Sequence, residues 1–267
     1  MAKSGHVDTF ARDNLPLREQ WPEFRFDLPD LQYPERLNCV TEWVDRWMEA
    51  GQGSRICMIS PSETLTYAQF HERVNRIANV LTRDLGLVPG GRVLLRGPNN
   101  PMMVASYFAV IKAGGVVVAT MPLLRAKELS YPLAKAKIAL ALCDARLADE
   151  MEKAKAQSAD LKRIVYWGNA SGELQALMEK PGYETFTACD TASDDVCLIA
   201  FTSGTTGEPK GTMHFHRDML NLRLLCQVRA AGRTGRPLYW LAAAGLHVRP
   251  RRVGAVSAAH RRVHGAA

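Results

Sequence analysis

Apolar positions along the chain follow two spacings, one typical of strands and one typical of helices. Short apolar runs predict buried strands over 55–60, 92–95, 116–119, 139–143, 164–167 and 196–201. The intervening segments predict helices over 66–81, 100–112, 125–135, 147–157 and 172–178. Strands that alternate with helices of this length favour right-handed crossovers. We therefore expect an α/β fold with largely parallel sheets and flanking helices.

Local signals place the starts of two of these helices. Thr66, with Gln69 three residues later, has the form of a capping box. Asn100 followed by Pro101 is a good N-cap with proline at the first helical position. Residues 1 to 35 mix charge, proline and aromatic residues without a period, which predicts an extended arm on a surface.

Charge is distributed unevenly along the 267 residues, whose formal net charge is +7. Eight arginines and no acidic residue lie within 226–267, which leaves 26 basic against 27 acidic residues before that tail. The body of the chain therefore carries no basic surface that would indicate nucleic-acid binding. The most apolar window, residues 104–120, is interrupted by Lys112 and a glycine pair, and the N-terminus lacks a signal-peptide pattern. We expect a cytoplasmic protein without a membrane span.

The six cysteines are scattered, at Cys39, Cys57, Cys143, Cys189, Cys197 and Cys226. The sequence contains no C-x-x-C pair and no His-rich spacing of the kind that predicts a metal site. It therefore indicates reduced thiols and no metal ligand.

The segment with the clearest chemistry is Thr-Ser-Gly-Thr-Thr-Gly-Glu-Pro-Lys-Gly at 202–211, directly after a predicted strand. Its glycines allow backbone conformations and a close approach that side chains forbid. Its hydroxyls donate hydrogen bonds to phosphate oxygens, its lysine adds positive charge, and backbone amides in such a turn form an anion site. The predicted phosphate contacts are Thr202, Ser203, Thr205, Thr206 and Lys210, and the glycines predicted to let the backbone approach the phosphates are Gly204 and Gly207. The spacing differs from the Walker pattern G-x-x-x-x-G-K-[ST].

This loop resembles the signature loop of the adenylate-forming superfamily, which includes acyl- and aryl-CoA synthetases, luciferases and peptide-synthetase adenylation domains. The match is unbroken over its ten positions. Leu65-Thr66-Tyr67 and the segment from Tyr107 to Pro122 also resemble motifs of that family, although ordinary packing explains each residue singly. The resemblance covers residues 10 to 225 and is closest in style to benzoate- and 2-aminobenzoate-CoA ligases.

The resemblance implies an acid–thiol ligase that uses ATP, Mg²⁺ and coenzyme A. In such a ligase an aromatic carboxylate attacks the α-phosphate of ATP to give acyl-AMP and pyrophosphate, and the CoA thiol then displaces AMP. Lys210 is expected to stabilise the charge that develops on the departing phosphates. His214 and His216 follow the loop, at or near the start of the next helix, and are candidates for either a general base or a structural role.

The expected domains are a partial AMP-binding domain over 1–225 and an Arg/Ala/Gly-rich tail over 226–267. The family's later motifs are absent from this tail. When a GC-rich back-translation of 235–250 is read one nucleotide later, it gives ADRFIGSPPLAFTFGL, which resembles the acid-pocket motif of aryl-CoA ligases. We therefore expect a frameshifted tail without a selected fold, and a chain that is inactive or weak. A nucleotide-binding fragment without catalysis, or a nucleic-acid-binding arginine tail, are the alternatives.

Overall fold

The computed structural model describes residues 3–27, 29–168, 172–202 and 209–220. Its centre is a six-stranded sheet in the order β6-β5-β3-β4-β7-β8. The strands are β3 (Arg92–Arg96), β4 (Val116–Thr120), β5 (Leu140–Asp144), β6 (Arg163–Trp167), β7 (Val196–Thr202) and β8 (Lys210–Phe215). All neighbours are parallel except β7 and β8, which form an antiparallel pair. The predicted α/β class with a largely parallel sheet is confirmed.

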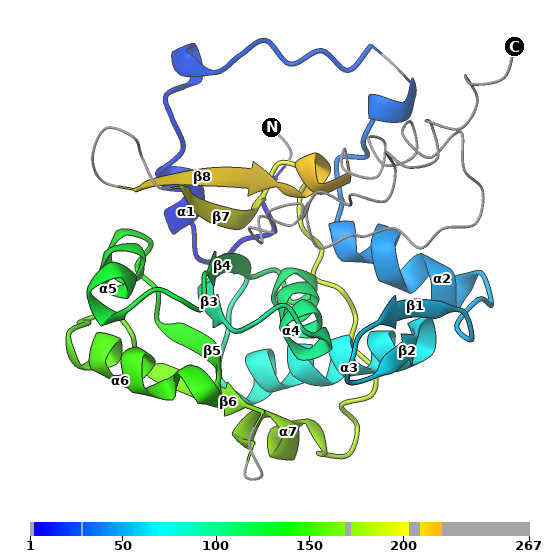
Figure 1. Ribbon diagram of the computed structural model, residues 1–267. Helices are drawn as coiled ribbons and strands as arrows, with labels where there is room; N and C mark the ends of the chain where they lie inside the picture. Colours follow the sequence, from blue (N-terminus) through cyan, green and yellow to red (C-terminus); the bar gives the residue numbers. More distant parts are fainter. Residues whose placement is uncertain (1–2, 28, 169–171, 203–208, 221–267) are drawn as a thin grey trace, which may run out of the picture.

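Helices cover both faces of this sheet (Figure 1). They are α3 (Tyr67–Asn79), α4 (Pro101–Lys112), α5 (Ala126–Lys135), α6 (Ala148–Ala156) and α7 (Glu173–Met178). One apolar cluster joins α3, α4 and α7 to the side chains of Val93 and Leu95, whereas the other joins α5 and α6 to Leu94. Successive strand residues thus point into opposite cores, which explains why the strands read as continuous apolar runs. None of the helices in the described part has the length and apolar character needed to cross a membrane.

The two predicted helix starts are confirmed. The Thr66 hydroxyl accepts a hydrogen bond from Gln69 N, and the Gln69 side chain accepts one from Thr66 N, which completes the capping box of α3. Asn100 Oδ1 accepts from Met103 N at 2.8 Å, with Pro101 at the first position of α4. A small antiparallel pair, β1 (Ile56–Ile59) and β2 (Thr64–Thr66), precedes α3. Strand β2 was not predicted from the sequence.

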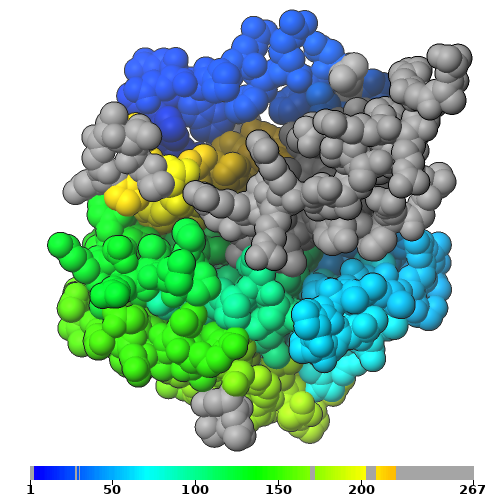
Figure 2. Space-filling model, viewed as in Figure 1, coloured from blue at the N-terminus to red at the C-terminus, as the bar shows by residue number. Residues whose placement is uncertain are grey.

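The N-terminal arm lies against β8, where its aromatic residues form a continuous contact. In Figure 2 the blue arm borders the gold and yellow β7–β8 region. The rings of Trp21 and Phe215 are 5.7 Å apart, and the Arg217 guanidinium lies 4.8 Å from the Phe215 ring centroid and 5.2 Å from that of Phe24. The arm is mainly extended, as expected, but also contains a short helix, α1 (Phe10–Asp13). It therefore packs on the strand in which the predicted phosphate-binding motif ends.

Gly90, just before β3, lies directly against the N-terminal arm, where Val7 N and Asp8 N donate to the Pro89 carbonyl at 3.0 and 2.9 Å. Its φ is +87°, and an added Cβ would collide with the backbone of Asp8. Gly90→Ala should therefore destabilise the chain by more than the cost of a left-handed backbone to a residue with a side chain, about 1–3 kcal/mol, because the collision adds to that strain; urea unfolding measures the loss. Gly51→Ala is the matched control because Gly51 has a similar φ of +67° but open space around the added Cβ. Equal losses of unfolding free energy in both variants would show that contact with the arm adds nothing to the cost of a side chain at position 90.

Candidate nucleotide-binding site

The predicted phosphate-binding motif begins at the end of β7 and ends in β8. Thr202 and Lys210 are paired across this hairpin, and the Thr202 hydroxyl donates to the Lys210 carbonyl at 3.4 Å. Both residues are exposed. Ser203, Gly204, Thr205, Thr206 and Gly207 lie outside the described residues. The structure thus brings together the two described ends of the motif and leaves the five other predicted contacts untested.

The hairpin emerges at the carboxyl edge of the parallel strands, where α/β sheets commonly bind ligands. Gly211, the last glycine of the motif, lies in β8 opposite Phe201. A Cβ at Gly211 would lie 3.1 Å from Ile199 Cγ2 and 3.4 Å from the Phe201 ring. Glycine therefore allows the two strands to approach closely at the base of the motif.

Arg96 orders the same edge of the sheet at the end of β3. Its side chain is almost fully buried and donates to the carbonyls of Met121, Pro122 and Leu124, at 3.1, 3.1 and 2.6 Å. Burial lowers the pKa of this guanidinium. Arg96 thereby holds the segment that follows β4. Sequence reasoning missed it because an arginine that closes a predicted strand gives no sign that it is buried.

Asp195 anchors the start of β7 to the N-terminal arm. Its carboxylate accepts hydrogen bonds from Ser4 Oγ at 2.5 Å, Gly5 N at 2.8 Å and Ala192 N at 2.8 Å. The Arg12 guanidinium lies 3.1 Å from the same group. Burial alone would raise the pKa of Asp195, but the hydrogen bonds that its carboxylate accepts, together with nearby His6, lower it below its ordinary value. Asp195 is thus a buried anion that joins the arm to the strand leading into the motif.

The two histidines after the motif occupy different environments. His214 lies within β8, which corrects the expectation that it sits at or near the start of a helix. His216 begins the helical residues 216–220 and is completely buried, and its Nδ1 accepts from Cys39 N at 3.2 Å. This environment supports the structural role for His216 over the general-base role. Strand β8 itself was not predicted.

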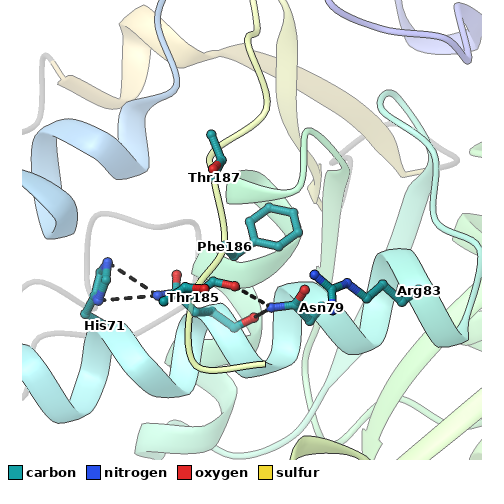
Figure 3. A pocket seen from close by; sticks show the side chains of 7 residues that line it. His71, Asn79, Arg83, Thr185, Phe186 and Thr187 are labelled. Carbon is teal, nitrogen blue, oxygen red and sulfur yellow. Dashed lines mark hydrogen bonds between the residues drawn. The ribbon is translucent and has the colours of Figure 1, made fainter. Parts of the chain in front are cut away.

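A groove of about 450 Å³ lies along α3, and none of the predicted site residues lines it (Figure 3 shows its lining). It is lined by His71, Asn75, Asn79, Arg83, Thr185, Phe186 and Thr187. The amides of Asn75 and Asn79 donate to main-chain carbonyls of residues 183–185 at 2.8–3.1 Å. Because these amides are used to hold the chain itself, the groove provides no evidence for a nucleotide site.

Comparison with known proteins agrees with the motif and the fold. The family of AMP-binding enzymes matches residues 44–252. The chain belongs to this family. The match extends past residue 225, the predicted domain boundary, which itself stays a prediction.

The relatives of this AMP-binding chain include benzoate–CoA ligase of Thauera aromatica, which is 31% identical over 193 residues, or 72% of this chain and 37% of that protein. The anthranilate CoA ligase AuaEII in complex with anthranoyl-AMP matches with a TM-score of 0.69 and 24% identity, over 75% of this chain and 39% of that one. ATP-bound MatB from Rhodopseudomonas palustris matches with a TM-score of 0.62 and 27% identity, over 72% and 37%. The chain therefore spans under two fifths of the length of these proteins.

Proposed function

We propose that this chain carries the ATP-phosphate-binding part of an ATP-dependent acid–CoA ligase that acts on an aromatic acid such as benzoate or 2-aminobenzoate. The observation that carries the proposal is that the two described ends of the unbroken 202–211 motif, Thr202 and Lys210, are paired at the carboxyl edge of a parallel sheet. Membership of the AMP-binding family and the ATP-bound structural relative support it.

Lys210 and the hydroxyls of the motif would act in the first half-reaction. When the carboxylate attacks the α-phosphate, negative charge develops on the departing pyrophosphate, and fixed donors with a positive charge stabilise it. Thr202 and Lys210 are exposed at the described ends of the motif, as such a contact requires. Ser203, Gly204, Thr205, Thr206 and Gly207 complete the proposed contacts.

The donor set of the motif is compatible with Mg²⁺ that is bound to the nucleotide phosphates rather than to the protein. The described ends of the motif offer a hydroxyl and an ammonium group, rather than a cluster of carboxylates. Mg²⁺ in phosphoryl-transfer sites is held largely by phosphate oxygens, where it neutralises charge on them. We therefore assign no metal ligand to the motif, and we place Thr202 and Lys210 on the phosphates.

The names of the relatives support an aromatic acid as the substrate. They include benzoate–CoA ligase and 3-hydroxybenzoate–CoA/4-hydroxybenzoate–CoA ligase, both of Thauera aromatica. Mycobacterium tuberculosis long-chain-fatty-acid–CoA ligase FadD13 matches at 32% identity over a shorter stretch, 58% of this chain. An assay panel should therefore contain benzoate, 2-aminobenzoate and a long-chain fatty acid. A cytoplasmic location also stays a prediction, consistent with ATP and CoA as substrates.

ATP–pyrophosphate exchange tests the proposal. The 267-residue chain should show no exchange with benzoate or 2-aminobenzoate, whereas the protein made after restoring the reading frame at the codon for Cys226 should show it. In that longer protein, Lys210→Ala should reduce exchange roughly 100-fold, the scale of one preorganised charge-stabilising donor. Lys135→Ala, which removes an exposed lysine at the end of α5, is the control. Equal exchange in the Lys210 variant and the parent would remove the proposed role of this lysine.

A further inference from the structure

Three potential metal ligands meet in the core below the β7–β8 hairpin. The ligand atoms of Cys39, Cys197 and His216 all lie within 4.8 Å of one another, and each residue is completely buried. Cys39 belongs to the segment that follows the arm, Cys197 lies on β7, and His216 directly follows β8. Three separate parts of the chain therefore converge on one point.

The spacing of this cluster is close to that of a tetrahedral zinc site. A Zn–S bond of about 2.3 Å places two sulfur ligands of one ion about 3.8 Å apart. The observed limit of 4.8 Å needs only a small contraction to reach that separation. Two thiolates and an imidazole form a donor set that thiophilic divalent ions prefer over Mg²⁺ or Ca²⁺. Among the described residues, no fourth acid, histidine or cysteine joins the group, so they supply three of four positions.

Polar atoms without partners surround the cluster. His216 Nε2 and Tyr107 Oη are buried and have no hydrogen-bond partner among the described residues. Tyr107 lies within electrostatic range of both thiols. Unpartnered polar atoms are rare in protein cores, and each needs an explanation such as a bound ion or water.

The hydrogen bond of His216 shows which ring nitrogen is available as a ligand. His216 Nδ1 accepts the Cys39 N–H at 3.2 Å, so Nδ1 carries a lone pair and Nε2 carries the ring proton. Metal binding through Nδ1 would replace this hydrogen bond with a coordinate bond.

We propose that Cys39, Cys197 and His216 form a three-ligand site for one thiophilic divalent ion of the Zn²⁺ class. Binding releases the two thiol protons and connects the segment at Cys39 to β7 and to the residue that directly follows β8. The site is structural and independent of the acid–CoA ligase function, because it uses none of the residues assigned to phosphate binding.

Titration of the chelator-treated full chain with Co²⁺ tests this site. One equivalent should bind with a thiolate-to-metal absorption band in the near ultraviolet, and Zn²⁺ should displace it. Cys39→Ser and Cys197→Ser should each abolish the band, and His216→Gln should weaken binding at least tenfold. Cys143→Ser is the matched control, because Cys143 is equally buried but lies in β5 outside the cluster. A band that persists in Cys39→Ser or Cys197→Ser, or its absence from the unmodified chain, would overturn the proposal.

X-ray absorption of the unmodified Zn²⁺-loaded chain gives a result that does not depend on how the variants fold. The account predicts two sulfur neighbours at about 2.3 Å and at least one nitrogen at about 2.0 Å. A shell of oxygen and nitrogen alone would refute the site. The site would also be refuted if Cys39 and Cys197 form a disulfide and the chain, once reduced, takes up no metal.

Discussion

Asp195→Ala should destabilise the chain by about 3–5 kcal/mol, because it removes one partner of a buried ionic group and leaves the other donors unmatched. The Asp195 side chain is fully buried against Arg12, Ser4 and two backbone amides. Urea unfolding measures the loss. Asp190→Ala is the control because the Asp190 carboxylate is 79% exposed, so its pairing with Arg36 should contribute only about 0–1 kcal/mol. Equal losses would show that the anchor contributes no more than a surface pair.

The same anchor predicts how stability depends on pH. The pKa of Asp195 is lower in the folded chain than its ordinary value of 3.8, so the unfolded chain binds the proton first as pH falls. The stabilisation by Asp195 is therefore complete above about pH 4 and is lost as the pH falls through the folded pKa. Asp195→Asn should show a shallower loss of stability in this acidic range, and an unchanged slope would contradict the assignment.

Asp45→Ala should cost a comparable amount, about 3–5 kcal/mol, because it leaves the buried Lys112 ammonium without its anion. Lys112 Nζ is 2.7 Å from Asp45 Oδ1 and 2.7 Å from Asn75 Oδ1, and its side chain is 1% exposed. Burial lowers the pKa of Lys112, and Asp45 partly offsets this. Thermal and urea unfolding of the variant measure the effect.

A double variant distinguishes loss of the Asp45–Lys112 ion pair from loss of packing as the cause of the destabilisation. Asp45→Leu combined with Lys112→Met replaces both charges with apolar groups and should recover most of the stability lost in Asp45→Ala. If the double variant is instead as unstable as the sum of the two single changes, the ion pair is not the cause.

The parts of the fold that follow from local patterns could be predicted from the sequence. Apolar runs marked β3 to β7, and the signals at Thr66 and Asn100 marked helix starts that the structure confirms. Strand β8 was missed because Lys-Gly-Thr-Met-His-Phe has no sustained apolar alternation, and three of its residues are exposed. Its strand conformation depends on pairing with β7, which is a tertiary contact.

The connections below the candidate site could not be predicted, because they join residues far apart in the sequence. Asp195 binds Ser4 across 191 positions, and Cys39 meets His216 across 177. The spacing of the cysteines gave no metal pattern, since Cys39 and Cys197 are brought together only by the fold. The predicted phosphate-binding motif could be recognised from the sequence because its residues are contiguous.

Equilibrium binding of ATP by calorimetry tests the central claim, that the turn between Thr202 and Lys210 binds the phosphate chain. The unmodified chain should bind ATP more tightly than AMP. A variant in which residues 203–208 are placed in a different order, with β7 and β8 unchanged, should lose at least tenfold in ATP affinity and lose the preference over AMP. Exchanging Pro61 and Ser62, which are both exposed between β1 and β2, is the control. Unchanged ATP affinity after the 203–208 turn is reordered would contradict the account.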